Sequence, residues 1–327
     1  MNSSERAVNE SINPLLVIYG FYCAEGLLQI GGNVLVITVV ATTIALREKE
    51  FILPAGLAFA DGITGCGQLW ASIDRYVITL TGRSKLRVPA IYCRFQPPPL
   101  LLEWGGYASS VMATMISIDR FVACYSIGAY VKLTKRYSVL LVLLAYSLAT
   151  VNVVINCAVV YLEPVEVSLY CFGGSSLPRW RAQMHWLFMA IFSYCSVIIY
   201  LVAFALLRCK DHTSQVSSLL KAKLLRQRKV TKALLHVSTC TFCLFCIPIT
   251  LFLSLDYITD VIRLKHLYGG VLFVIVNLNS CYNVILYYCK NGDVRRSIKR
   301  MLCFRKNVAT VSVVSQAFTT NTRGRVE

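Results

Sequence analysis

Long apolar stretches, separated by short polar ones, make up most of this chain. Seven of them reach the length of about 20 mostly apolar residues that a helix needs to cross a bilayer. Four of the seven contain no Asp, Glu, Lys or Arg, which is typical of helices whose surroundings are lipid. The pattern therefore predicts an all-α fold, a seven-transmembrane helix bundle, with spans near residues 14–45, 51–79, 97–124, 137–162, 184–207, 233–255 and 267–289.

These spans predict a single membrane domain over residues 14–290, because no repeat or Pro/Gly-rich linker divides it. A short polar segment, residues 1–13, precedes it and is expected to be extracellular. After the last span, apolar and basic side chains separate onto two helical faces, which predicts a short amphipathic eighth helix over 291–303 on the cytoplasmic membrane surface. Cys303 at its end is a candidate for palmitoylation, with an unmodified thiol as the alternative. We expect residues 304–327 to form a disordered cytoplasmic tail.

Composition and charge agree with a membrane protein: 56% of the residues are hydrophobic and 15% are charged. A net charge of +17 would suggest nucleic acid as the partner of a soluble protein. Here the basic residues lie mostly between and after the apolar stretches, so we expect membrane lipid and no nucleic acid. With the N-terminus outside, 23 of the 33 basic residues fall on the cytoplasmic side. The prediction is a multi-pass plasma-membrane protein, and Asn2 and Asn9 lie in glycosylation sequons on its outer side.

Most of the 14 cysteines lie within apolar stretches, where a thiol acts as a small hydrophobic group. Cys93 precedes the third span and Cys171 lies in the loop after the fourth, so both face the oxidising side. We therefore predict a disulfide between them. The four histidines lie in different segments, so the sequence predicts no catalytic residues and no enzyme activity.

Polar side chains inside the spans are functional candidates because they are costly in hydrocarbon. Asp61 lies in the middle of the second span and Asn33 in the middle of the first. Oxygen-bearing side chains on other spans can surround this carboxylate and hold a sodium ion. The alternative is a hydrogen-bonded polar cluster around a protonated Asp61. The remaining members of this candidate metal site are Ser109, Asn279, Ser280 and Asn283.

Two further features suggest a moving part. Asp119, Arg120 and Phe121 end the third span, where the arginine must pair or face water because it keeps its charge. Pro248 interrupts the sixth span and permits a kink. Alone, each is also compatible with a helix anchor or an ordinary membrane proline.

Taken in order, these residues resemble the rhodopsin-like (class A) G-protein-coupled receptors over about residues 15–303. The sequence looks closest to nematode serpentine chemoreceptors of the Srsx class. The segments that carry this resemblance are Ile18-Tyr-Gly20, Phe95-Gln-Pro-Pro-Pro99, Ile116-Ser-Ile-Asp-Arg-Phe121 and Asn279-Ser-Cys-Tyr-Asn283 with Tyr287-Tyr288.

The resemblance implies roles for particular residues. Arg120 matches the arginine that meets the G protein, and Asp61 with its four partners matches the sodium pocket of the family. The outer disulfide matches Cys93 and Cys171. The other switch positions that the resemblance implies are Asp119, Phe121, Tyr200, Phe242, Pro248, Asn283 and Tyr287.

Several residues depart from the family pattern. Val284 replaces the proline of the seventh helix, and Cys246 stands where the switch tryptophan is usual. Arg228 occupies a place where many relatives carry an acid. These departures concern the switching mechanism more than the fold.

The predicted function is a chemoreceptor that senses an extracellular small molecule and activates a heterotrimeric G protein, with sensory cilia as the expected site. The alternatives are a receptor for an internal neuropeptide or amine, or a transporter or channel. Leu102 fills the position where an amine receptor carries its acid, which weakens the amine interpretation. Candidates for the ligand pocket are Glu103, Tyr107, Trp186 and Phe273, with Trp104 and Tyr268 as weaker ones.

Overall fold

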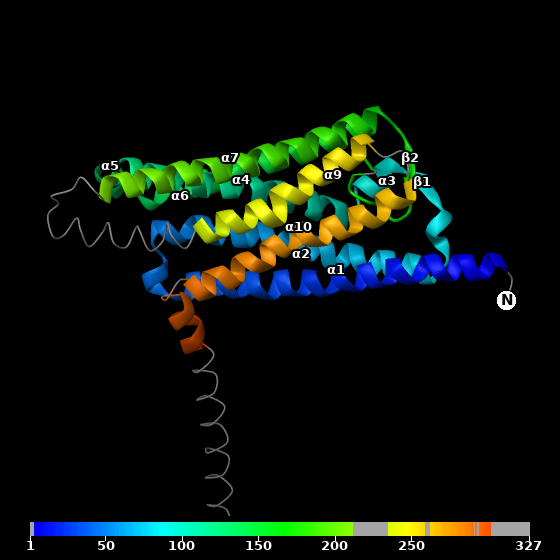
Figure 1. Ribbon diagram of the computed structural model, residues 1–327, viewed down its shortest axis with the longest axis horizontal. Helices are drawn as coiled ribbons and strands as arrows, with labels where there is room; N and C mark the ends of the chain where they lie inside the picture. Colours follow the sequence, from blue (N-terminus) through cyan, green and yellow to red (C-terminus); the bar gives the residue numbers. More distant parts are fainter. Residues whose placement is uncertain are drawn as a thin grey trace, which may run out of the picture.

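The structure, a computed structural model, describes residues 3–174, 176–211, 235–258, 262–290, 292 and 294–301. Long helical segments run side by side along one axis (Figure 1). The predicted all-α bundle is confirmed. Its long segments are α1 (Ser3–Thr42), α2 (Lys49–Leu80), α4 (Pro97–Tyr125), α6 (Lys135–Leu162), α7 (Arg179–Asp211), a sixth segment ending in α9 (Ile247–Ile258), and α10 (Ile262–Lys290).

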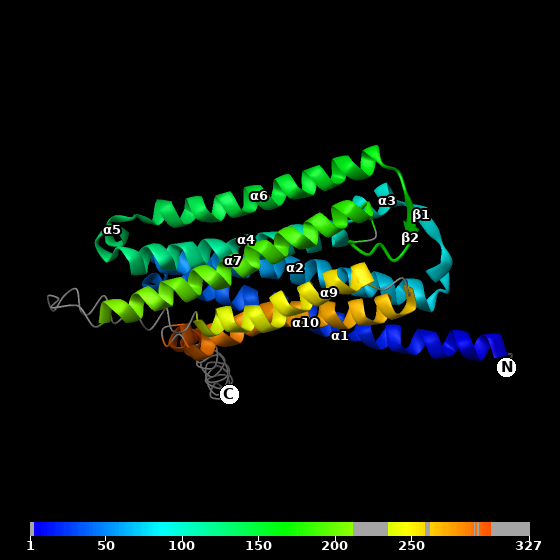
Figure 2. The same cartoon turned by 45° about the horizontal axis from the view of Figure 1, so that its top comes forward.

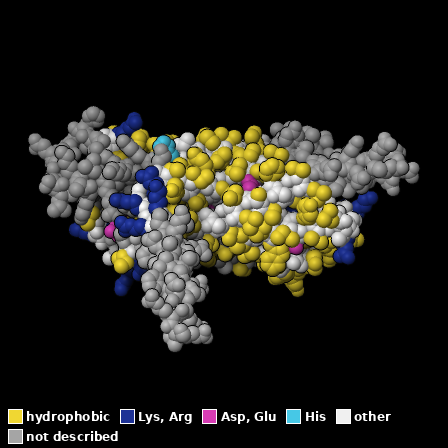
Figure 3. Space-filling view, turned by 90° about the horizontal axis from the view of Figure 1, so that it is seen from below, with side chains coloured by type: hydrophobic (Ala, Val, Ile, Leu, Met, Phe, Trp, Pro, Cys, Tyr) yellow, Lys and Arg dark blue, Asp and Glu magenta, His cyan; other side chains and the backbone are white. Residues whose placement is uncertain are grey.

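The bundle surface has the character expected of a protein in lipid. Within the described residues, five segments are long and apolar enough to cross a membrane: Leu15–Thr42, Lys135–Leu162, Arg179–Cys209, Leu235–Ser254 and Gly269–Cys289. Large apolar side chains such as Leu140 and Ile155 of α6 are exposed. Figure 3 shows apolar side chains over the middle of the molecule and most Lys and Arg toward its ends.

The second and third predicted spans, α2 and α4, are more polar because they lie inside the bundle. Sixteen residues of α2 and seventeen of α4 are buried, compared with six of α6. Several of those buried residues are charged or polar, including Asp61, Arg75, Glu103 and Arg120. A helix shielded by neighbours can carry such groups, whereas a lipid-facing helix cannot.

Glycines bring α1, α2 and α4 unusually close together. A Cβ atom added to Gly26 would lie 2.8 Å from the backbone nitrogen of Leu69, and one added to Gly65 would lie 2.8 Å from Cβ of Gln29. At Gly105 of α4 an added Cβ would lie 2.3 Å from Oγ1 of Thr64. Small residues permit close helix packing in membranes, where packing rather than the hydrophobic effect holds helices together.

The sixth segment contains a change of helix type. Residues 235–241 are α-helical, Phe242–Cys246 form a π-helix (η3), and α9 continues from Ile247. The backbone N–H of Ile247 donates to the carbonyl of Phe242, five residues back. Pro248 follows at once and has no N–H to offer, so the π turn and the proline together mark the predicted hinge.

One end of the bundle, here called the disulfide end, is closed by short elements. These are η2 (Arg83–Lys85), α3 (Ala90–Arg94) and an antiparallel pair of strands, β1 (Arg87–Pro89) and β2 (Glu166–Ser168), with Val88 opposite Val167. The Cys93–Cys171 disulfide is present, which confirms the prediction. The N-terminus lies at this same end (Figure 2).

The opposite end, here called the Arg120 end, holds η1 (Ile44–Leu46), α5 (Ile127–Lys132) and a helical turn over residues 294–301. Val294 and Ile298 of that turn are buried against Val39, Leu46 and Phe51. The predicted surface helix therefore rests its apolar side partly on the bundle.

Several predicted boundaries and modification sites lie near the two ends of the chain. The first helix begins at Ser3, well before the predicted start at residue 14. Asn9 is helical but its side chain is not among those described, and Asn2, Cys303 and the 304–327 tail lie outside the described residues. Their predicted roles stay predictions.

We predict that Gly105→Ala destabilises the bundle, because the added methyl group must displace Thr64 and the α2 backbone. Overpacking of this kind costs about 1–3 kcal/mol. Thermal unfolding of the purified protein should show a lower midpoint. Gly31→Ala is the matched control, since no atom lies within 4 Å of its added Cβ. Equal midpoints for the two variants would contradict the close approach.

Candidate functional site

A buried ion pair occupies the Arg120 end of α4. Nη2 of Arg120 lies 2.5 Å from Oδ2 of Asp119, and both residues are at most 2% exposed. Tyr130 of α5 joins them: Nη2 of Arg120 donates to its hydroxyl at 3.2 Å, and the hydroxyl donates to Oδ2 of Asp119 at 3.2 Å. The arginine is thus paired within the bundle rather than facing water.

Tyr130 is itself held by α2. Nζ of Lys49 donates to the backbone carbonyls of Tyr130 and Leu133, and it lies 3.9 Å from the Tyr130 ring centroid. Burial raises the pKa of the Tyr130 phenol, and the nearby Arg120 charge opposes this shift. The phenol therefore stays protonated and remains a donor to Asp119 near neutral pH.

Deeper in the bundle, Asp61 of α2 accepts three side-chain hydrogen bonds. Ser109 donates from 2.7 Å and Ser280 from 3.0 Å, both to Oδ1, while Nδ2 of Asn283 lies 3.5 Å from Oδ2. Asp61 is 1% exposed. The structure therefore brings together four of the five residues predicted to form one polar site.

The fifth residue is engaged elsewhere. Oδ1 of Asn279 accepts a hydrogen bond from Thr241 of the sixth segment at 3.3 Å. Asn33 bonds within its own helix, donating to the carbonyl of Gln29 at 2.9 Å. Asn279 thus joins α10 to the segment that carries the π turn.

The chemistry around Asp61 fits a small hard cation. It comprises one carboxylate, two hydroxyl oxygens and the amide oxygen of Asn283, which is buried without a hydrogen-bond partner among the described residues. Oxygen ligands of this kind suit sodium, and an unpaired buried acceptor is the group that a cation would satisfy.

Two tyrosine hydroxyls lie between the Asp61 and Arg120 layers. Tyr200 of α7 and Tyr287 of α10 both line the central cavity. Neither hydroxyl has a hydrogen-bond partner among the described residues, although both are buried. Such groups need a partner that this arrangement lacks, which suits the role as switch positions that the resemblance implies for both tyrosines.

Two phenylalanines of the sixth segment, Phe242 and Phe245, lie in different surroundings. Phe242 is 38% exposed and meets Tyr194 edge-on, with ring centroids 6.2 Å apart. Phe245 is buried and lines the cavity together with Pro248. Phe245 was not among the predicted switch residues, and it lies within the π turn, where the spacing of an α-helix does not hold.

One cavity of about 1690 Å³ connects the surroundings of Asp61 with the tyrosines Tyr200 and Tyr287. It reaches from Lys85 and Tyr170 at the disulfide end, past Asp61, to Tyr200 and Tyr287. Glu103, Trp186 and Phe273 line it, as predicted for the ligand pocket.

The other pocket candidates lie differently. Tyr107 packs against His185, with ring centroids 5.9 Å apart, and is not among the described lining residues. Trp104 contacts Tyr146 and donates to Thr150 on the outside of the bundle. The side chain of Tyr268 is not among those described.

Glu103 is the centre of a buried network that the sequence interpretation missed. It forms an ion pair with Arg94 of α3 and accepts a hydrogen bond from Asn156 of α6 at 2.6 Å. Arg181 of α7 donates to Asn156 and, at 3.0 Å, to Asn152. Asn152 and Asn156 lie one turn apart on the fourth span, and this spacing is the feature of the sequence that could have indicated the network. The network neutralises the carboxylate and ties four helices together.

A model of the 7 transmembrane receptor (rhodopsin family) matches residues 32–287. G-protein coupled receptor 6 of Rattus norvegicus and of Mus musculus is 31% identical over 120 residues, and that of Homo sapiens is 30% identical. Each match covers 37% of this chain and 29% of the relative, so it spans less than a third of the relatives' length.

We predict that Glu103→Gln strongly destabilises the protein, because it leaves Arg94 buried without its counter-charge. Breaking a buried pair in this way costs about 3–5 kcal/mol. The double variant Glu103→Gln/Arg94→Met should recover most of the loss, since it removes the orphaned charge. Thermal unfolding of the three proteins measures this. Equal losses in the single and double variants would show that the ion pair is not the cause.

Proposed function

Since the chain belongs to the rhodopsin family of seven-transmembrane receptors, we propose that it is a G-protein-coupled chemoreceptor for an extracellular small molecule. The observation that carries the proposal is the single cavity that runs from the loops at the disulfide end to the tyrosines above the Asp119–Arg120 pair. A ligand at one end can therefore act on the groups at the other. The family is one of receptors, which argues against the transporter and channel alternatives.

The proposed orientation places the N-terminus and the disulfide end outside the cell. Basic residues concentrate in the segments that would then be cytoplasmic. A disulfide is stable on the oxidising side of the plasma membrane. In this orientation Arg120 lies at the cytoplasmic end, where a G protein would bind.

The proposed mechanism is a shift between two populations. The structure has Arg120 paired with Asp119 and Tyr130. A ligand that binds more tightly when the sixth segment has moved outward would favour the open form. The π turn and Pro248 are the hinge for that movement, and Tyr200 and Tyr287 gain the hydrogen-bond partner that they now lack. The freed Arg120 would then contact the G protein.

Chemoreception is favoured over an internal amine ligand by the state of Glu103. An amine requires a carboxylate that is free to accept its charge. Glu103 is already neutralised by Arg94 and hydrogen-bonded to Asn156. The resemblance to nematode serpentine chemoreceptors supports a sensory role, and reporter expression confined to internal neurons rather than sensory cilia would argue against it.

We predict that Arg120→Ala abolishes ligand-driven G-protein signalling while leaving the amount of protein at the cell surface largely intact. The ligand would come from a small-molecule screen on cells that express the chain and several G-protein reporters. An antibody against a tag after residue 2, applied to intact cells, measures surface protein and also tests the orientation.

Arg136→Ala is the matched control, because Arg136 is an exposed arginine at the same end. It should signal normally. Normal signalling by Arg120→Ala would refute the proposed role, and tag staining only after permeabilisation would refute the orientation.

We also propose that Asp61, Ser109, Ser280 and Asn283 hold a sodium ion, which would screen the buried carboxylate. Sodium chloride should then raise the unfolding temperature of the purified protein more than choline chloride does. Asp61→Asn should remove this difference, whereas Asp74→Asn, an exposed acid on the same helix, should keep it. An equal response to both salts in the unmodified protein would rule the ion out.

A further inference from the structure

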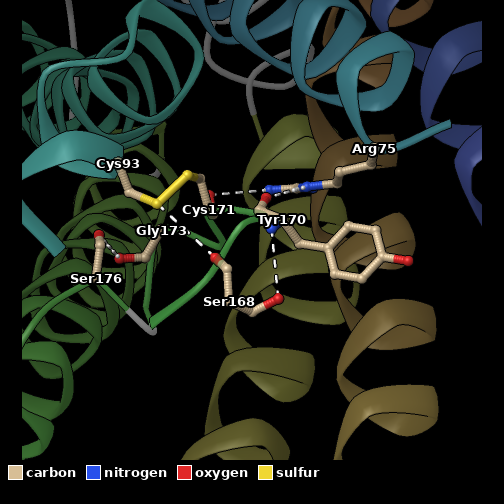
Figure 4. The surroundings of a disulfide bond; sticks show 7 residues. All are labelled: Arg75, Cys93, Ser168, Tyr170, Cys171, Gly173 and Ser176. Atoms are coloured by element: carbon tan, nitrogen blue, oxygen red, sulfur yellow. Dashed lines mark hydrogen bonds between the residues drawn. A yellow bond between two sulfur atoms is a disulfide. The ribbon is translucent and has the colours of Figure 1, made fainter. Parts of the chain in front are cut away.

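Another buried arginine, Arg75, lies near the disulfide, at the disulfide end of α2 (Figure 4). Arg75 is 5% exposed. Its Nε donates to the carbonyl of Tyr170 at 3.1 Å, and its Nη2 lies 3.5 Å from the carbonyl of Cys171. Its Cζ lies 4.5 Å from the ring centroid of Phe172. The guanidinium is thus held against the loop that follows β2, and the same residue lines the cavity.

These contacts use only some of the hydrogen-bond donors of the guanidinium. Arginine has five N–H donors in a planar fork that matches a carboxylate or phosphate. Two atoms of Arg75, Nε and Nη2, have hydrogen-bond partners among the described residues, and both partners are neutral carbonyls. Donors therefore remain for a further acceptor.

The charge of Arg75 also lacks a compensating anion in the described part of the chain. The two ion pairs found there are Arg94–Glu103 and Arg120–Asp119. The neighbouring Asp74 is exposed and is not within ion-pairing distance of Arg75. A buried charge without a counter-charge is costly.

The acids that share the cavity with Arg75 are already engaged. Glu103 is paired with Arg94, and Asp61 is held by Ser109 and Ser280. Lys85 adds a second positive charge at the rim, where it is exposed. The described outer part of the cavity is therefore electropositive.

A second, independent observation points to an occupant at the same place. Tyr19 of α1 lines the cavity and is 2% exposed, and its hydroxyl has no hydrogen-bond partner among the described residues. Its ring lies 6.1 Å from that of Tyr170, whose carbonyl binds Arg75. A buried donor without a partner, next to an arginine with donors to spare, fits an acceptor that comes from outside the chain.

We propose that Arg75 and Tyr19 bind the anionic group of the ligand, a carboxylate or phosphate on an apolar body. This inference rests on the proposed receptor function and names the class of ligand. Arg75 supplies charge-assisted hydrogen bonds and Tyr19 a neutral one. The surroundings suit an apolar body, because the Tyr22 and Phe273 rings meet edge-on, 5.4 Å apart, among the lining residues.

A purely structural role for Arg75, as an anchor of the loop after β2, predicts different behaviour. An anchor would stabilise the protein equally with and without anions. A binding residue makes the stability depend on the anion, since a ligand that binds only the folded protein raises its unfolding temperature.

The test uses the full chain, purified in phosphatidylcholine nanodiscs, and measures thermal unfolding with octanoate, octyl phosphate, octanol and octylamine. A second set, 4-phenylbutyrate, 4-phenylbutanol and 4-phenylbutylamine, changes the body and keeps the head groups. We expect the anions to raise the midpoint and the matched alcohols and amines to leave it unchanged. Nanodiscs containing phosphatidylglycerol, without added ligand, test whether a lipid head group supplies the anion.

Arg75→Gln should weaken the anion effect about tenfold or more, as expected for a lost hydrogen bond between charged groups. Tyr19→Phe keeps every contact of Arg75 with the loop and should weaken the anion effect roughly threefold or more. Arg75→Lys keeps the charge and should retain part of the effect. Arg83→Gln is the matched control, because Arg83 is an exposed arginine of η2, and it should behave as the unmodified protein.

An Arg75-dependent shift with either soluble anions or phosphatidylglycerol supports the proposal and identifies the source. No shift with any anion, equal shifts with alcohols, or a full shift in both Arg75→Gln and Tyr19→Phe overturns it. The unfolding measurement needs no G protein. Anion binding without signalling would therefore remove the proposed function alone, and signalling by uncharged ligands alone would remove this inference alone.

Discussion

Charged groups inside a bundle that lipid surrounds need partners that water would otherwise supply, and this constraint organises the molecule. Three buried sites satisfy this need for partners in different ways. Arg120 is neutralised by Asp119, Glu103 by Arg94, and Asp61 is held by hydroxyl and amide donors. Tyr130 joins the Arg120 pair to α5, and the bonds to Glu103 and Asp61 join several helices, so the buried charges also fix how the helices pack.

These sites are linked by the cavity and by the sixth segment. Thr241 of that segment donates to Asn279 of α10, beside the residues that hold Asp61. Phe245, within the π turn, lines the cavity. A displacement of this segment therefore changes the ligand space and the polar core together, which is the physical basis of the coupling we propose.

Much of the fold could be predicted from the sequence, because lipid imposes a simple rule of length and hydropathy. The third predicted span, 97–124, differs from α4 by one residue, and the Cys93–Cys171 disulfide followed from the topology. The network around Glu103 could not be predicted, since its members come from four helices and only Asn152 and Asn156 share a recognisable spacing. Phe245 was missed because periodicity assumes an unbroken α-helix, which the π turn interrupts.

The glycine contacts distinguish a closely packed part of the bundle, α1, α2 and α4, from the sixth segment. Gly26, Gly65 and Gly105 let α1, α2 and α4 approach so closely that backbone atoms of the neighbouring helix lie within about 3 Å of an added Cβ. The sixth segment instead carries a π turn and a proline, whose backbone bonds are easily exchanged. In the proposed mechanism the first three long helices stay in place while the sixth segment moves against them. Arg75 of α2 and Arg120 of α4 both belong to the helices that stay in place.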